Sequence, residues 1–286
     1  MARTVYINGQ LVPEDQAKVS VFDRGLLYGD GVFEGIRLYR GKAFRLAEHI
    51  RRLFDSARFT ALPIPVDEAE MAQIVERTCE ANRIEDGYVR LIVTRGVGDL
   101  GLDPRKVKEP TIICIADTIT LYPKEFYEKG LALITSAVRR YHPESLNAQV
   151  KSCNYLNNIL AKLEAIRGGT IEAVMLNHQG YVAECTGDNI FLVADGELKT
   201  PAASAGALKG ITRDVVIQLA QDMGMPVQEP AITRYDLYTA EECFLTGTAA
   251  EIVPVTEIDG RPIGSGQPGP VTRKLLDAFH RLVNGG

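Results

Sequence analysis

The chain has 286 residues, 45% of them hydrophobic, and a formal net charge of −5 at pH 7. This length and composition are typical of a globular protein with a large core and two lobes. The interspersed charges argue against a nucleic-acid surface, and no apolar run of about 18 residues predicts a membrane span. The N-terminus also lacks the apolar core of a signal peptide.

The five cysteines and four histidines are scattered along the chain, and no C-x-x-C pair occurs. This pattern favours free thiols in a reducing compartment over a disulfide framework, and it predicts no metal site. We therefore expect a cytoplasmic protein whose chemistry comes from other residues.

The N-terminal part predicts strands interrupted by helices. Asn8-Gly9 lies between the segments Val5-Tyr6-Ile7 and Gln10-Leu11-Val12, which indicates a hairpin because this pair readily takes the positive φ angles of a tight turn. Asp67 is placed to cap a helix. Apolar spacing predicts a strand at 32–38, helices at 46–59 and 68–82, and strands at 88–94 and 111–116.

The second part begins with a predicted strand at 132–138. Ser152 is placed to cap a helix that ends at Gly168-Gly169. The apolar face of that helix is expected to contain Tyr155, Leu156, Ile159, Leu160, Leu163 and Ile166. A β-meander over 173–199, a helix at 212–223 and a C-terminal helix at 270–282 follow.

These elements predict an α/β (α+β) protein of two domains. The expected smaller N-terminal domain covers residues 1–118, and the larger C-terminal domain covers residues 131–286. Residues 119–130, where the pattern weakens around Pro123, are expected to form the connection between the two domains.

Gly96-Val97-Gly98-Asp99-Leu100-Gly101 matches the G-x-G-x-x-G of dinucleotide-binding proteins. In those proteins the third glycine opens a helix that binds the pyrophosphate. Here a charged segment containing Pro104 leads straight into the next strand. We therefore expect an irregular loop near a substrate and no nicotinamide or flavin site.

Lys151 follows an apolar residue at the expected end of a strand or loop. A lysine in such a place can lose its proton through desolvation and act as a nucleophile, although position alone favours a solvated surface lysine. Gly210-Ile211-Thr212 at a helix start could bind phosphate or could be an ordinary cap. The small residues of Gly247-Thr248-Ala249 permit close backbone approach to a ligand or simple packing.

Together, several segments resemble the successive motifs of the fold-type IV pyridoxal-phosphate enzymes, and most closely those of branched-chain amino-acid aminotransferases. The similarity covers nearly the whole chain in order. The segments are residues 28–37 (YGDGVFEGIR), 48–53 (EHIRRL), 151–158 (KSCNYLNN), 184–191 (ECTGDNIF), 210–213 (GITR) and 247–252 (GTAAEI).

The resemblance implies that Lys151 carries pyridoxal 5'-phosphate as a Schiff base and moves the substrate proton. It also implies a strand-rich N-terminal domain and a C-terminal pseudo-barrel that binds the cofactor. Glu184 would hold the proton on the pyridine nitrogen. The other implied cofactor contacts are Arg52, Ile211, Thr212 and Thr248 at the phosphate, Tyr155 at the phenolic oxygen and Leu208 on one ring face.

For substrates, the resemblance implies L-leucine, L-isoleucine and L-valine as amino donors and 2-oxoglutarate as acceptor, with 2-oxo acids and L-glutamate as products. The expected partners are these small molecules and a second copy of the chain, in a homodimer or larger homo-oligomer. The implied substrate-binding residues are Tyr28, Phe33, Tyr88, Arg90, Thr248 and Ala249.

Other enzymes of the same fold remain alternatives: a D-amino-acid aminotransferase, an (R)-amine transaminase or aminodeoxychorismate lyase. Tyr28-Gly29-Asp30-Gly31 resembles the D-specific enzymes too, but the Arg-x-His pair expected of them near Tyr88 is absent. A binding protein without a cofactor is the alternative from another class, and it would lack the absorbance of a pyridoxal Schiff base.

Overall fold

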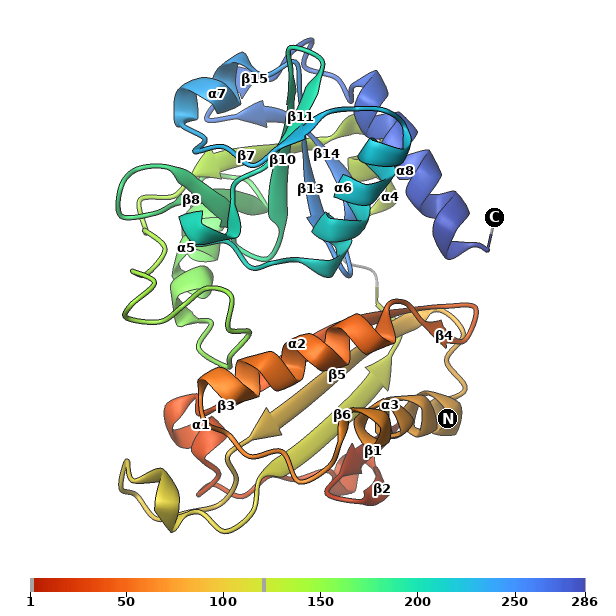
Figure 1. Ribbon diagram of the computed structural model, residues 1–286, viewed down its shortest axis with the longest axis vertical. Helices are drawn as coiled ribbons and strands as arrows, with labels where there is room; N and C mark the ends of the chain where they lie inside the picture. Colours follow the sequence, from red (N-terminus) through yellow and green to blue (C-terminus); the bar gives the residue numbers. More distant parts are fainter. Residues whose placement is uncertain (1–2, 120–121, 286) are drawn as a thin grey trace. The chain divides into compact units, whose positions relative to one another are not determined.

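The computed structural model describes residues 3–119 and 122–285, which form two compact units. The first unit contains residues 3–119 and Val150–Asn154, and the second contains residues 122–149 and 155–285. Figure 1 colours most of the first unit red to yellow and most of the second green to blue. The segment around Lys151 therefore belongs to the first unit although its neighbours in sequence belong to the second.

The first unit is a six-stranded sheet with the strand order β2-β1-β6-β5-β3-β4. Neighbouring strands in this sheet are antiparallel. Its strands are β1 (Thr4–Ile7), β2 (Gln10–Pro13), β3 (Gly31–Tyr39), β4 (Lys42–Ala43), β5 (Gly87–Thr94) and β6 (Thr111–Asp117). Its helices are α1 (Arg24–Tyr28), α2 (Leu46–Phe59), α3 (Glu68–Asn82) and the 3-10 turns Glu14–Gln16 and Pro104–Lys106.

Two of the predicted local signals in this unit are confirmed. Asn8 and Gly9 have φ values of 44° and 91° and form the turn between β1 and β2. The side chain of Asp67 accepts a hydrogen bond from the Glu70 amide and caps α3. Helices α2 and α3 pack their apolar residues against alternate residues of β3, β5 and β6, so the other face of each strand is left for other contacts.

The second unit contains a nine-stranded sheet in which eight strands follow the order β12-β11-β10-β13-β14-β7-β8-β9 and β15 pairs with β14. Its strands are β7 (Leu131–Thr135), β8 (Glu172–Leu176), β9 (Val182–Cys185), β10 (Asn189–Ala194), β11 (Glu197–Lys199), β12 (Val227–Gln228), β13 (Glu242–Gly247), β14 (Glu251–Ile258) and β15 (Arg261–Pro262). Its helices are α4 (Lys124–Lys129), α5 (Leu156–Arg167), α6 (Ile211–Asp222), α7 (Arg234–Thr239), α8 (Pro270–Val283) and the 3-10 turn Ala203–Ala205.

The predicted β-meander over 173–199 is wrong, although its strands exist. β8 pairs with β9 and β10 pairs with β11, but β13, β14, β7 and β8 separate β10 from β9 in the order of the sheet. The two local hairpins are therefore separated by three strands, β7, β14 and β13, in the order of the sheet. The turns between paired strands are local signals, whereas the order of the hairpins depends on long-range pairing.

The predicted role of Ser152 as a helix cap is also wrong. Helix α5 begins at Leu156 with Tyr155 at its N-cap, and no side chain caps it. Ser152 instead forms a β-bridge with Val32 at the start of β3. This bridge takes the segment around Lys151 into the first unit before the helix begins.

The apolar face predicted for α5 does not face the core. The buried residues of the helix are Asn158, Ala161 and Ala165. Its large apolar residues are exposed, namely Leu156, Ile159, Leu160, Leu163 and Ile166. The periodicity was helical, but the small residues pack inward and the large ones remain uncovered in this chain.

The mixed α and β fold in two units is confirmed. The predicted domain limits stay a prediction: within the expected connection, residues 120–121 lie outside the described residues and Lys124–Lys129 forms α4. No helix within the described residues is long and apolar enough to cross a membrane.

Candidate active site

The predicted site residues fall into two groups, one in each unit. The first group lies on and beside β3. The Phe33 amide donates to the Lys151 carbonyl at 2.9 Å, and the Lys151 amide donates to Ser56 Oγ on α2 at 3.1 Å. These contacts fix the backbone of Lys151 against the sheet. Its Nζ lies 4.7 Å from the centre of the Phe33 ring.

The surroundings of Lys151 favour a neutral amine. Burial, and after it the positive charge of Arg52, lowers the pKa of Lys151 below its usual value. Glu34 and Tyr88 act in the opposite direction but do not outweigh these effects. A desolvated lysine of lowered pKa is the kind of residue that works as a nucleophile and a base near neutral pH.

Tyr88 and Arg90 lie on the same face of the sheet as Phe33. The Arg90 guanidinium stacks on Phe33 and Tyr88, with its carbon 4.5 Å and 5.5 Å from the two ring centres. Gly35 makes room for this arrangement, because a Cβ there would overlap the Tyr88 hydroxyl group. Three of the predicted substrate residues therefore lie together beside Lys151.

Tyr28 lies at the C-terminal end of α1, and its hydroxyl group donates to the Leu100 carbonyl at 2.5 Å. Leu100 belongs to the glycine-containing loop, which is irregular as predicted. The buried Arg24 donates to the Gly101 and Leu102 carbonyls and pairs with Asp30 at 3.2 Å. These contacts hold the loop in one conformation beside Tyr28.

Arg52 is held by a buried carboxylate. Its Nε and one terminal nitrogen donate to the two oxygens of Glu34 at 2.7 Å and 2.8 Å, and His49 Nδ1 lies 2.7 Å from the same carboxylate. Burial alone would raise the pKa of Glu34, but the Arg52 charge and His49 hold it well below its usual range. Glu34 and His49 were missed as site residues. The sequence did contain a signal for Glu34, because this acidic residue occupies an inward position of β3, on the same face as the apolar residues Val32, Ile36 and Leu38.

The second group centres on Glu184 in β9. Glu184 accepts hydrogen bonds from the Leu208 amide at 2.8 Å and from Asn189 at 3.4 Å, and it pairs with Arg140 at 3.0 Å. Arg140 also donates to Asn158 at 2.7 Å. These contacts fix the orientation of the Glu184 carboxylate. Arg140 lies in an irregular segment, and no sequence pattern indicated it.

Leu208 leads into the N-terminus of α6, where Ile211 and Thr212 are buried. Gly210 is the N-cap, and no side chain caps the helix. A Cβ at Gly210 would overlap Asn189 Oδ1, so only glycine fits. The first N–H groups of a helix attract anions, and this N-terminus therefore suits a phosphate group.

The segment with Thr248 and Ala249 follows β13. Asn189 of β10 is paired with Thr246 of β13, and its side chain bonds to Glu184. The turn after β13 therefore follows a residue that is paired with a partner of Glu184. Thr246 Oγ1 is buried and has no hydrogen-bond partner among the described residues. Tyr155 is the N-cap of α5, the helix that carries Asn158. The N–H groups at the start of α6 thus suit the predicted phosphate, and the Glu184 carboxylate suits a protonated ring nitrogen as its acceptor.

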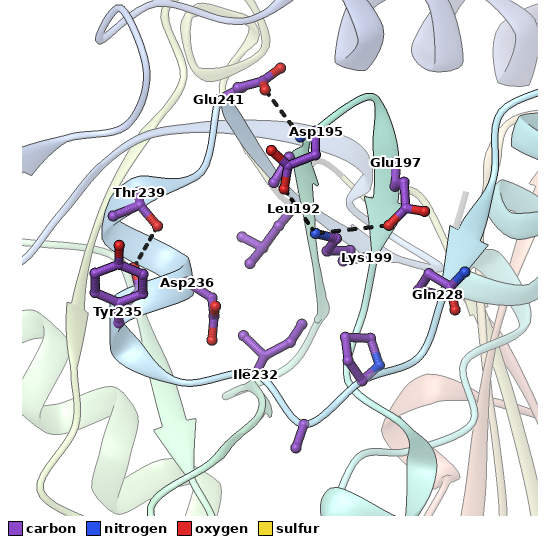
Figure 2. Close-up of a pocket in the computed structure, with 13 residues that line it drawn as sticks. Leu192, Asp195, Glu197, Lys199, Gln228, Ile232, Tyr235, Asp236, Thr239 and Glu241 are labelled. Atoms are coloured by element: carbon purple, nitrogen blue, oxygen red, sulfur yellow. Dashed lines mark hydrogen bonds and ion pairs between the residues drawn. The ribbon is translucent and has the colours of Figure 1, made fainter.

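Figure 2 shows a cavity of about 530 Å³ elsewhere in the second unit. Its charged groups pair with each other: Lys199 lies 3.5 Å from Asp195 and 3.9 Å from Glu197. None of the predicted site residues lines it. We therefore assign the chemistry to the Lys151 and Glu184 groups.

The chain is similar to known proteins over its whole length. The family model described as amino-transferase class IV matches residues 31–258. A protein of Methanocaldococcus jannaschii is 56% identical over 275 residues, which are 96% of this chain and 94% of that protein. The solved Escherichia coli branched-chain amino acid aminotransferase has a TM-score of 0.97 and 36% identity, covering 100% of this chain and 96% of that one.

A further branched-chain amino acid aminotransferase, from T.th., was solved with ligands. Its structure with pyridoxamine 5'-phosphate has a TM-score of 0.95 and 38% identity, covering 100% of this chain and 95% of that one. The same protein complexed with N-(5'-phosphopyridoxyl)-L-glutamate has a TM-score of 0.94 at the same identity.

Proposed function

Because the chain belongs to the class IV aminotransferases, we propose that it transfers the amino group of L-leucine, L-isoleucine and L-valine to 2-oxoglutarate. The products are the corresponding 2-oxo acids and L-glutamate. The observation that carries this proposal is the position of Lys151, an amine of lowered pKa beside Phe33, Tyr88 and Arg90. Relatives named as branched-chain aminotransferases match nearly all of the chain.

The cofactor is pyridoxal 5'-phosphate, in line with the ligands of the T.th. protein. When bound, it supplies an aldehyde that takes up amino groups and a ring that withdraws electrons from the substrate Cα. Lys151 attaches it covalently and moves the proton at that carbon. Glu184, fixed by Arg140, keeps a proton on the ring nitrogen.

The remaining cofactor residues bind the phosphate and position the ring. Arg52 contributes its charge at the phosphate, and Glu34 orients the guanidinium. The amides of Ile211 and Thr212 contribute the positive end of α6, and Thr248 adds a further donor. Tyr155 donates to the phenolic oxygen, and Leu208 packs against the ring.

The substrate residues divide by chemistry. Tyr88 and the amides of Thr248 and Ala249 bind the α-carboxylate, while Phe33 and Tyr28 contact the branched side chain. Arg90 pairs with the distal carboxylate of glutamate and otherwise stays stacked on the aromatic rings. One site can then accept both an apolar and an acidic side chain.

A substrate panel tests this function. The purified protein is supplied with L- and D-amino acids and with (R)-amines, each with 2-oxoglutarate, and the glutamate formed is measured. We expect activity with L-leucine, L-isoleucine and L-valine and ping-pong kinetics. A preference for D-amino acids or (R)-amines contradicts the proposal, as does release of pyruvate from aminodeoxychorismate without a 2-oxo acid acceptor.

We also propose that two copies of the chain associate through the exposed stripe of α5. Leu156, Leu163 and Ile166 have exposed fractions of 67%, 43% and 60%. Five large apolar side chains on one helix face form the kind of patch that marks a protein interface. The partner of the chain is then its own copy, and the free cysteines fit a cytoplasmic location.

A further inference from the structure

Asp188 is a buried acid that the proposed chemistry does not use. It precedes β10, and 6% of it is exposed. The Tyr122 hydroxyl group donates to its Oδ2 at 3.0 Å. A Cβ at Gly247 would overlap its Oδ1, so this carboxyl oxygen lies directly against the backbone at the end of β13. Asp188 therefore contacts the turn that contains Thr248 and Ala249.

The charges around Asp188 are mainly negative. Among the described residues, no cation lies within ion-pair distance of it, and Lys162, whose charge acts on it, pairs with Glu172. The titratable groups that face it come from several elements. They are Tyr122 before α4, Lys162 on α5, Glu172 on β8, and Glu184 and Cys185 on β9.

Glu172 accepts more hydrogen bonds than its neighbour Asp188. Its Oε1 accepts hydrogen bonds from the Ala173 and Thr186 amides, each at 2.8 Å, and its Oε2 lies 3.0 Å from Lys162 Nζ. Glu172 thus has three donors, one of them charged, whereas Asp188 has one neutral donor in the part of the chain that the structure describes, the Tyr122 hydroxyl group. The small number of donors at Asp188 favours a proton on this carboxyl group.

We propose that Asp188 is a positioning residue for the turn Gly247-Thr248-Ala249, and that it must carry a proton when the turn binds an anion. This inference rests on the proposed role of the Thr248 and Ala249 amides in binding a carboxylate. An ionised Asp188 would lie against the same turn and repel that ligand in a region of low dielectric. A neutral Asp188 holds the turn and adds no repulsion.

Titration agrees with the geometry. Burial, and after it the charge of Glu172, raises the pKa of Asp188 to about 7. Below this pH the carboxyl group is neutral and the turn accepts an anion. Above it, binding requires the uptake of one proton, so affinity falls as pH rises.

The test measures binding of 4-methylvalerate, a leucine-like carboxylate without an amino group, to the full-length holoenzyme. Its Kd is determined from pH 5.5 to 8.5 by calorimetry in buffers of different ionisation enthalpy, which also gives the protons taken up. We expect the wild-type Kd to rise up to about tenfold per pH unit above pH 7. In Asp188→Asn, the increase in Kd that comes from ionisation of Asp188 should disappear, together with the proton taken up on binding. The variant should then bind 4-methylvalerate more tightly than the wild type at pH 8.5.

Two further variants make the test specific. Tyr122→Phe removes a donor that favours the charged carboxylate, so the rise in Kd should begin at higher pH. Glu172→Gln removes a negative neighbour, so the rise should begin at lower pH. A purely structural role of Asp188 would change Kd by a similar factor at every pH and would not produce these opposite shifts.

The outcomes separate this inference from the proposed function. If Asp188→Asn shows the same pH dependence of Kd and the same proton uptake as the wild type, the inference is wrong and the proposed branched-chain transamination is unaffected. A failed substrate panel together with the expected pH dependence would overturn the function and leave the inference standing. Absence of binding to the wild-type holoenzyme at every pH would overturn the inference, because the turn would then bind no carboxylate.

Discussion

Lys151 shows how the surroundings of a common residue type change its pKa. In water its ammonium group would keep its proton far above neutral pH, and it would be a poor base. Its backbone is fixed by Phe33 and Ser56, and burial with Arg52 nearby lowers its pKa. The fold thus supplies the desolvation that the sequence could only suggest.

Lys151→Ala should abolish transamination and covalent cofactor attachment while leaving the fold intact. The measurement is borohydride reduction of the wild-type holoenzyme followed by peptide mapping, with circular dichroism of the variant as the control. Reduced cofactor found on Lys162, Lys199 or Lys209 would contradict the assignment.

Arg90→Ala should lower kcat/KM for glutamate and 2-oxoglutarate, because a charge-assisted contact to the distal carboxylate is lost. The decrease should correspond to a loss of ~2 kcal/mol of transition-state stabilisation. The leucine half-reaction should change little and serves as the internal control. Arg90→Lys should recover part of the glutamate activity. Equal losses for leucine and glutamate would rule out the dual role of this residue.

At the scale of elements, α5 shows that a spacing which predicts a helix does not predict which face of the helix is buried. Its apolar spacing predicts a helix, and a helix forms, but Ala161 and Ala165 face the core while the leucines and isoleucines face outward. Small side chains let the helix approach the sheet closely, so the larger ones are available for another surface. The apolar stripe is therefore the surface through which we propose that two copies of the chain associate.

Leu163→Asp should dissociate the proposed assembly, because a charge in the centre of an apolar interface loses its hydration without gaining a partner. Sedimentation velocity across a concentration series measures the change. Met223→Asp, which replaces another exposed apolar residue outside the stripe, is the matched control. An unchanged sedimentation coefficient for Leu163→Asp would show that the interface lies elsewhere.

At the scale of the whole molecule, buried charges connect stability with pH. Glu34 has almost no exposed surface and holds both Arg52 and His49. The native state depresses the pKa of Glu34, so the stabilisation is present above the unfolded-state pKa. It is lost as pH falls through the range between the unfolded and native pKa values.

Glu34→Gln should lower the free energy of unfolding at pH 7 by about 3 kcal/mol, because the partly buried Arg52 loses its ionised partner. The difference from the wild type should shrink as the pH is lowered below about 4, the ordinary pKa of a glutamate in the unfolded chain. Urea unfolding at a series of pH values measures both effects. A destabilisation that is constant with pH would point to lost packing instead of a lost charge.

The sequence by itself determined the local elements and the chemistry. The hairpin at Asn8-Gly9 and the cap at Asp67 depend on neighbouring residues alone, and the motif segments identified the family through short ordered patterns. The roles of Lys151 and Glu184 follow from that resemblance and stay predictions, because the position of Lys151 alone favoured a solvated surface lysine.

Only the tertiary structure decided which distant residues meet. The order of β8 to β11 in the sheet, the partners of Glu184 and the position of Asp188 against Gly247 all result from contacts between segments far apart in the chain. Such contacts depend on long-range strand pairing and on burial, which a local pattern does not encode. The outward face of α5 has the same origin, since periodicity predicts a helix but not which of its faces the core will cover.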